Sequence, residues 1–227
     1  MVEPQEKMNL RWFGQSCFYL TSGAGTRLLM DPYAKWFGYR MPQVQAQAVT
    51  TSHTHFDHNN IRAVHGDFQH IDRPGNYQAG DITIHGTLAW HDAVQGAKRG
   101  RNIIFTFAVD GLNVCHLGDL GHLLSPQQVA EIGRVDILLL PVGGAFAISV
   151  PEALQVRRQL QPAVTIPMHY RTKALGLGGL LFARLEVFLS SVGEPARKAR
   201  ELSVDPGSLA ANAGILLLSY DQPKTID

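Results

Sequence analysis

A short run of potential metal ligands, Ser52-His53-Thr54-His55-Phe56-Asp57-His58-Asn59, constrains this chain more than any other feature of its sequence. It directly follows an apolar, β-branched stretch over 46–51 that predicts a strand. In an extended or loop segment alternate residues project to one side, so His53 and His55 can converge on one metal ion, with Asp57 and His58 beside it. A loop of solvated histidines is the alternative, but the position at the end of an apolar strand favours a metal site.

Two ions would need more ligands than this loop supplies, and three further candidates follow predicted strands. Asp119 lies in His116-Leu117-Gly118-Asp119-Leu120-Gly121, where the glycines allow close approach of the backbone and a carboxylate could bridge two ions. His169 follows a strand expected over 163–168, and His91 comes after one expected over 81–85. Strand ends gathered on one edge would bring the three together, although each taken singly could be a structural polar residue.

Composition supports imidazole chemistry over thiolate chemistry. The 227 residues include 10 His but only 2 Cys, and Cys17 and Cys115 form no CxxC pair, which excludes a disulfide framework and an all-thiolate zinc site. A formal net charge of +1 gives no reason to expect a nucleic acid or a bilayer as partner. The absence of a signal-like or membrane-spanning apolar stretch, together with the unpaired cysteines, predicts a cytoplasmic protein without a transmembrane segment.

Strands precede helices along the chain. Strands over 10–21 and 27–30 flank Ser22-Gly23-Ala24-Gly25 as in a hairpin, and Asp110-Gly111 joins strands over 102–109 and 112–116 through a tight turn. The later part of the chain predicts helices and buried strands in alternation: helices over 127–132, 151–160 and 180–192, and strands over 136–142, 163–168 and 214–220. No linker or repeat divides the sequence, so we expect a single domain over 1–227 with α/β layers and mixed sheets.

The ordered motifs resemble the metallo-β-lactamase superfamily. H-x-H-x-D-H, then His91, Gly118-Asp119 and Pro-x-His169 are similar to its compact branch of zinc-dependent hydrolases, related to the ascorbate-6-phosphate lactonases and the N-acyl phosphatidylethanolamine phospholipases. The segments over 139–144, 152–153, 161–162 and 166–170 are especially similar to that branch, and the resemblance covers roughly residues 9–172. It implies a four-layer αβ/βα sandwich, in which two mixed β-sheets are flanked by helices and the metals lie at one edge between the sheets.

The same resemblance implies a ligand set. It assigns the first metal to His53, His55 and His91, the second to Asp57, His58 and His169, and the bridge between them to Asp119. In the best-known members the third histidine lies farther downstream, so His85 and His116 remain rivals to His91. Histidine at position 55, where oxygen-reducing di-iron members have Glu, favours hydrolysis. We expect two divalent ions. Zinc is the expected metal, although the N/O ligand set also suits manganese or iron.

The expected reaction is hydrolysis of an ester, lactone or phosphodiester bond by a metal-bound hydroxide. Asp57 would orient this nucleophile and accept its proton. His122 is a candidate proton donor or a partner of a ligand, with a plain loop histidine as the alternative. Lys98, Arg99 and Arg101 could flank the metals and suit a small anionic substrate, for instance a phosphorylated one, or could form a solvated basic turn.

Three further candidates lie near the late motif. Tyr170 is a candidate oxyanion donor and Arg171 a further basic group, and Gly143-Gly144 either lets the backbone approach the substrate or forms a tight turn. A nuclease of the same fold and a non-catalytic metal-binding or sensing protein remain the alternative functions. A small-molecule substrate is the expected partner, no nucleic acid is expected, and a homo-oligomer is compatible with the sequence.

Overall fold

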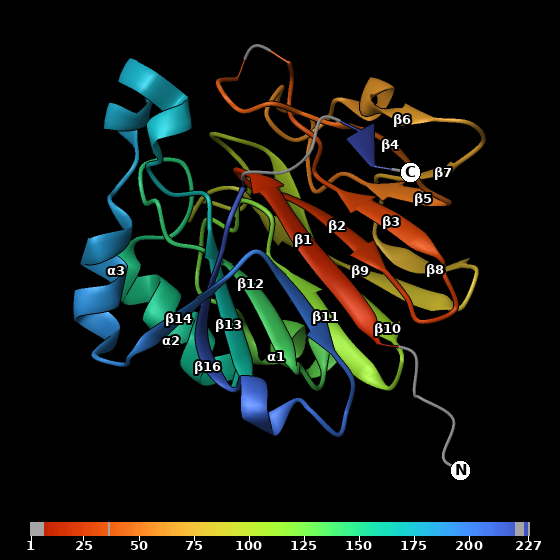
Figure 1. Cartoon of the computed structure of the whole chain (residues 1–227). Helices are drawn as coiled ribbons and strands as arrows, with labels where there is room; N and C mark the ends of the chain where they lie inside the picture. The colour runs from red at the N-terminus through yellow and green to blue at the C-terminus, as the bar shows by residue number, and fades with distance from the viewer. Residues whose placement is uncertain (1–6, 36, 221–224, 227) are drawn as a thin grey trace.

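The computed structural model describes residues 7–35, 37–220 and 225–226. Figure 1 shows two large β-sheets that face each other, with the α-helices gathered against one of them. The first sheet has the strand order β15 (Glu201–Val204), β1 (Met8–Gly14), β2 (Cys17–Thr21), β3 (Arg27–Met30), β5 (Ala48–Thr50) and β7 (Gln69–Ile71). The second has the order β14 (Ala196–Ala199), β16 (Gly214–Leu218), β13 (Val164–Met168), β12 (Ile137–Pro141), β11 (Leu112–His116), β10 (Arg101–Val109), β9 (Ile82–Trp90) and β8 (Gly75–Ala79).

Both sheets are mixed, which confirms the α/β sandwich that the sequence predicts. In the first sheet β1, β2 and β3 are antiparallel, whereas β3, β5 and β7 are parallel. In the second, β8 to β11 are antiparallel and β11, β12, β13 and β16 are parallel. The hairpin turn at Asp110-Gly111 is as expected, with φ of 49° and 74° at its two residues.

The first sheet is buried on both faces. Its inner face carries Leu10, Phe18 and Leu28, which join the core that fills the space between the sheets. Its outer face carries Tyr19 and Leu29, which form a second cluster with residues from the segment over 33–64. That segment contains the short 3₁₀ turn η1 (Ile61–Ala63) and the strands of a small third sheet, β4 (Gln43–Gln45) and β6 (Val64–His65), to which β17 (Thr225–Ile226) adds.

The α-helices cover the outer face of the second sheet. They are α1 (Pro126–Ile132), α2 (Val150–Leu160) and α3 (Leu185–Val192), and their apolar residues, such as Val156 and Phe188, extend the same core. Two further 3₁₀ segments are η2 (Lys173–Leu181) and η3 (Ala210–Asn212). No helix in the described part of the chain is long and apolar enough to cross a bilayer.

Three predicted elements differ from the structure, the first being the strand expected over 81–85, which continues to Trp90 as β9. The stretch over 10–21 is two antiparallel strands, because Gly14 and Gln15 adopt φ of 104° and 52° and reverse the chain. The helix expected over 180–192 begins only at Leu185, because the Ala183 N–H donates to Gly143 and the backbone of Arg184 pairs with Arg171. These contacts hold residues 182–184 extended, whereas Leu180 and Leu181 end the 3₁₀ segment η2.

Candidate metal centre

The potential ligands come together because the strands that precede them run in the same direction within each sheet. In the first sheet the parallel strands β3 and β5 end before Asp31 and before the histidine loop. In the second, β9, β11 and β13 all run the same way, since β10 is antiparallel to both β9 and β11. Their carboxyl ends carry His91, Asp119 and His169 toward one edge. The fold therefore gathers side chains from five strand ends that are distant in sequence.

The gathered side chains form two clusters that could each hold a metal ion. One consists of His53, His55 and His91, and the other of Asp57, His58, Asp119 and His169; in each, the potential ligand atoms lie within 4.8 Å of one another. Oδ2 of Asp119 is 3.3, 3.4 and 3.2 Å from Nε2 of His58, His91 and His169. It is also 3.9 Å from Nε2 of His53. Asp119 thus lies between the two clusters.

Several buried atoms at this centre have no hydrogen-bond partner among the described residues. They are Nε2 of His58, both ring nitrogens of His91 and of His169, and Oδ1 of Asp119. A buried polar atom without a partner destabilises a fold by about 1–3 kcal/mol, and native proteins contain few of them. Imidazole nitrogens and carboxylate oxygens are ligands of zinc, manganese and iron. The residues present therefore fit divalent metal ions.

The protonation of the cluster follows from burial and mutual charge. Burial alone would raise the pKa of Asp119, but His169 and His58 offset this and hold that pKa well below its ordinary value. Burial, and then the nearby His58, hold the pKa of His53 well below that of a free histidine. Asp119 is thus an anion and His53 a neutral imidazole near pH 7, the forms in which both bind metals.

Asp31 is a buried part of this centre that the sequence analysis missed. Its Oδ1 accepts the Ser52 N–H at 2.7 Å, and its Oδ2 accepts the Ser52 hydroxyl at 2.6 Å and lies 2.7 Å from Nδ1 of His58. The Ser52 Oγ is in turn 3.0 Å from Nδ1 of His53. Asp31 therefore orients two imidazoles so that their Nε2 atoms face the centre. Its signal in the sequence is the same as that of the others: it follows the apolar strand Leu28-Leu29-Met30.

Glycines allow the strand ends to approach each other closely. A Cβ atom on Gly121 would lie 2.3 Å from the carbonyl carbon of His91, and one on Gly143 would lie 1.8 Å from the carbonyl oxygen of His169. A Cβ on Gly118 would lie 2.6 Å from Cβ of Ser52. Gly143 thus lies close to the backbone of His169, whereas its interpretation as a point where the backbone approaches the substrate stays a prediction.

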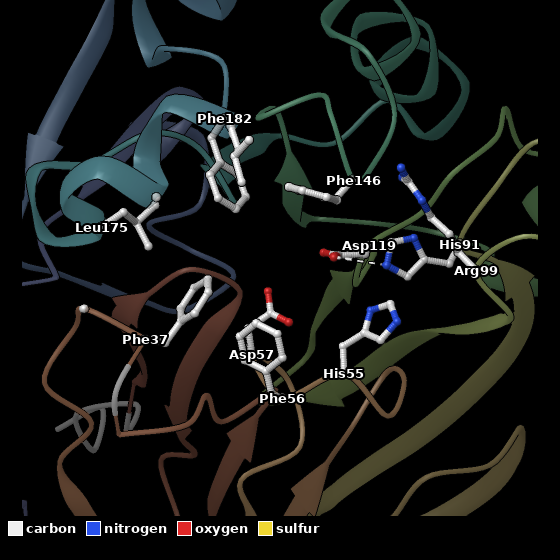
Figure 2. A pocket seen from close by; sticks show the side chains of 13 residues that line it. Phe37, His55, Phe56, Asp57, His91, Arg99, Asp119, Phe146, Leu175 and Phe182 are labelled. Atoms are coloured by element: carbon white, nitrogen blue, oxygen red, sulfur yellow. Dashed lines mark ion pairs between the residues drawn. The ribbon is translucent and has the colours of Figure 1, made fainter.

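A cavity of about 580 Å³ opens beside the two clusters. Figure 2 shows Asp57, His55, His91 and Asp119 on one side of it and aromatic side chains around the rest. Its lining residues are Phe37, Gly38, His55, Phe56, Asp57, His91, Arg99, Asp119, Phe146, Leu175, Gly178, Leu181 and Phe182. Apart from the candidate ligands, the wall is apolar with a single cation, Arg99.

The two rival histidines, His116 and His85, contact other groups of the protein and not the candidate ligands. Nε2 of His116 is 2.8 Å from the Ser16 carbonyl and its Nδ1 accepts the Gly118 N–H, so neither nitrogen is free for a metal. His85 lies between Asn76 and Glu131, away from the cavity. Of the three rivals, only His91 lies among the other candidate ligands.

His122 is not a lining residue of this cavity. Its Nε2 accepts the Trp90 N–H at 3.1 Å and its Nδ1 is 2.7 Å from the Leu123 carbonyl, beside a separate surface hollow. It therefore supports the strand end before His91 and has no contact with the space beside the clusters, which argues against the role of proton donor.

Three other candidates can be placed relative to the cavity. The ring of Tyr170 packs in the core against Trp12, 5.3 Å between ring centroids, and Tyr170 is not a lining residue of the cavity. Of the basic turn, Arg99 reaches the cavity, whereas Lys98 does not line it and Arg101 lines a neighbouring small hollow. Arg171 is not a lining residue either.

Known proteins resemble the chain in sequence and in fold. Residues 9–169 match the Beta-lactamase superfamily domain. A UPF0173 metal-dependent hydrolase of Carboxydothermus hydrogenoformans is 30% identical over 231 residues, covering 87% of this chain and 94% of that protein. Another of the same name, from Methanoculleus marisnigri, is 30% identical over 193 residues, covering 73% and 82%. A solved structure from Thermotoga maritima, named as a Zn-dependent hydrolase of the metallo-β-lactamase superfamily, has a TM-score of 0.77 and 36% identity, covering 93% of this chain and 98% of that one.

Proposed function

Because the chain belongs to the UPF0173 metal-dependent hydrolase family of the metallo-β-lactamase superfamily, we propose that it is a hydrolase with a dinuclear metal site. On this proposal His53, His55 and His91 would hold one ion, Asp57, His58 and His169 would hold the other, and Asp119 would be the ligand shared by the two. The observation that carries the proposal is the position of Asp119 Oδ2, within 3.4 Å of Nε2 atoms that belong to both clusters.

When bound, the two ions would lower the pKa of a water molecule and so supply a hydroxide nucleophile near neutral pH. The roles of the side chains follow from their contacts. Asp57 lines the cavity and its Oδ2 accepts the Gln15 amide at 3.1 Å, so its carboxylate is held where it can orient the nucleophile and accept its proton. Asp31 fixes the orientation of His58.

We propose zinc as the metal. The imidazole-rich ligand set supports it, as does the name of the Thermotoga maritima protein, although manganese and iron use the same donor atoms. The two cysteines are free and buried, which supports our further proposal of a cytoplasmic protein.

The bond to be cleaved is, on this proposal, that of an ester, a lactone or a phosphodiester in a small anionic substrate. Relationship to the lactonase and phospholipase branch remains part of the proposal, supported by the early position of His91, whereas histidine at position 55 supports hydrolysis over oxygen reduction. A nuclease is the second candidate within the fold, but a single lining cation and a net charge of +1 offer little to a polyanion.

The test is metal content together with chelator-sensitive turnover. We expect the purified protein to bind about two equivalents of zinc and to hydrolyse at least one member of a panel of aryl esters, lactones and phosphodiesters. Activity should be lost in a chelator and restored by added zinc. Stoichiometric metal without chelator-sensitive turnover on the panel would favour a metal-binding or sensing protein instead.

A further inference from the structure

The cavity beside the metal clusters combines an apolar wall with one cation, and this combination is informative about the substrate. Phe182 is buried and stacks edge-on against His169, with 5.0 Å between ring centroids, and Phe146 packs against Phe182 at 5.6 Å. Leu175 and Leu181 extend this surface. A cavity of about 580 Å³ with such walls suits a small ligand that has an apolar group.

Arg99 is held at this wall by the loop that follows His91. The Asp92 carboxylate accepts four backbone N–H groups, those of Val94, Gly96, Lys98 and Arg99, at 2.7–2.9 Å. The His91 N–H donates to the Gly100 carbonyl at 3.1 Å, so both ends of the loop are joined beside a candidate ligand. The backbone of Arg99 therefore keeps a fixed position relative to His91.

The guanidinium of Arg99 lies over the face of Phe146, 5.5 Å from the ring centroid (Figure 2). It forms no ion pair with any carboxylate of the described residues, although Asp57 and Asp119 line the same cavity. A planar guanidinium presents paired donors that match the two oxygens of a carboxylate. An oxyanion of the substrate can thus be bound by Arg99 while an apolar group contacts the phenylalanines.

We propose that the substrate of this hydrolase is an amphipathic monoanion: an aryl or acyl group seated against Phe146, Phe182 and Leu181, and a carboxylate bound by Arg99. This inference rests on the proposed function, since it concerns what is brought to the same metal site. Away from the candidate ligands, Arg99 is the one cation among the described lining residues, and its paired donors match the two oxygens of a carboxylate on the part of the substrate that lies against this wall. Arg99 is a substrate-binding residue in this scheme and takes no part in proton transfer.

Binding of small probes to the zinc-loaded protein tests the proposal independently of turnover. The probes are 4-phenylbutyrate, its uncharged amide, butyrate and 2-phenylethyl phosphate, measured by calorimetry. We expect phenylbutyrate to bind about tenfold or more tightly than the amide, butyrate and the phosphate. Arg99→Gln should remove the advantage of phenylbutyrate over its amide and leave binding of the amide unchanged. Lys98→Gln, which removes the adjacent cation outside the lining, should change neither.

A second pair of variants, at Leu181 and Leu177, tests the contribution of the apolar wall. Leu181 lines the cavity and is 61% exposed, whereas Leu177 is 86% exposed and lies outside the lining, so both can be changed without opening the core. Leu181→Ser should weaken phenylbutyrate about threefold or more, and Leu177→Ser should not. Butyrate, which lacks the aryl group, should bind equally to both variants.

The outcomes separate this inference from the proposed function. If phenylbutyrate still binds more tightly than its amide to Arg99→Gln, the carboxylate binds elsewhere, for instance to the metal itself, and the inference is wrong. Tighter binding of the phosphate than of phenylbutyrate would overturn it as well. If the probes bind as expected but no ester is hydrolysed in a chelator-sensitive way, the binding inference stands and the hydrolase proposal fails. In the opposite case, turnover that is indifferent to charge and to Arg99→Gln supports the hydrolase and overturns the inference.

Discussion

Removing the carboxylate of Asp119 would leave the Nε2 atoms of His58, His91 and His169 facing one another across a buried space. Since this one side chain lies 3.2–3.4 Å from all three, it is the shared element of both clusters. We expect Asp119→Ala to lose bound zinc and activity together, by more than the 10–100-fold that supporting residues of metal sites cost. Metal analysis and ester hydrolysis measure the two effects. His65→Ala, at an exposed position away from the clusters, is the control, and two zinc ions retained at full occupancy in Asp119→Ala would contradict the ligand assignment.

A substitution at Asp31 tests how much the orientation of the His58 imidazole contributes to zinc affinity. Asp31→Asn keeps the shape of the side chain but removes the charge that faces Nδ1 of His58 at 2.7 Å. We expect zinc affinity to fall about 10- to 100-fold, with the fold retained, because the imidazole is no longer fixed in one tautomer. Competition with a chromogenic chelator measures the affinity. The exposed Asp67→Asn serves as control, and an unchanged affinity in Asp31→Asn would show that the remaining contacts suffice to orient His58.

At the scale of the elements, the close approach of two strand ends depends on Gly143. Its hydrogen bond to Ala183 and its contact with the His169 backbone leave no room for a side chain, since an added Cβ would lie 1.8 Å from a carbonyl oxygen. We expect Gly143→Ala to destabilise the metal-free protein by at least about 1–3 kcal/mol and to weaken metal binding, because His169 must move. Urea unfolding in chelator measures the first effect. Gly178→Ala, where nothing lies within 4 Å, should cost far less, and equal stability of the two variants would refute the argument.

The sequence predicts these elements well where local chemistry decides the structure. The turn at Asp110-Gly111, the short helix expected over 127–132 and the buried strand β12 all follow from short patterns. The sequence likewise predicts the loop of candidate metal ligands, because histidines at alternate positions after an apolar strand indicate a metal site. The break at Gly14-Gln15 and the late start of α3 are not, because contacts with residues distant in sequence impose them.

At the candidate site, too, contacts between residues distant in sequence could not be predicted from local patterns. Asp31 has the pattern of a ligand, an acid after an apolar strand, but only the tertiary fold shows that it contacts His58 and Ser52 rather than the cavity. For His116 the sequence left the role open, and the Ser16 carbonyl, a hundred positions away in the chain, decides it. Residues that act through partners remote in sequence therefore required the structure.

At the scale of the whole molecule, the proposed metal site joins the two sheets. The loop after β5 of the first sheet supplies His53, His55, Asp57 and His58, and the ends of β9, β11 and β13 of the second supply His91, Asp119 and His169. Without ions, buried polar atoms of His58, His91, Asp119 and His169 at this junction lack hydrogen-bond partners among the described residues. With ions bound they would become cross-links between two sheets that also share the apolar core.

Metal removal should therefore destabilise the entire fold and not only the site. A ligand that binds only the folded state at 100 times its Kd stabilises it by about 2.7 kcal/mol, which corresponds to a rise in Tm of about 5–10 °C for a chain of this size. We expect thermal unfolding of the zinc-loaded protein to shift down by about this amount in a chelator and to recover on addition of zinc. In Asp119→Ala the chelator should have little effect, whereas His65→Ala should respond as the unmodified chain does. Loss of metal that left the Tm of the unmodified chain unchanged would contradict tight binding of the ions to the folded state.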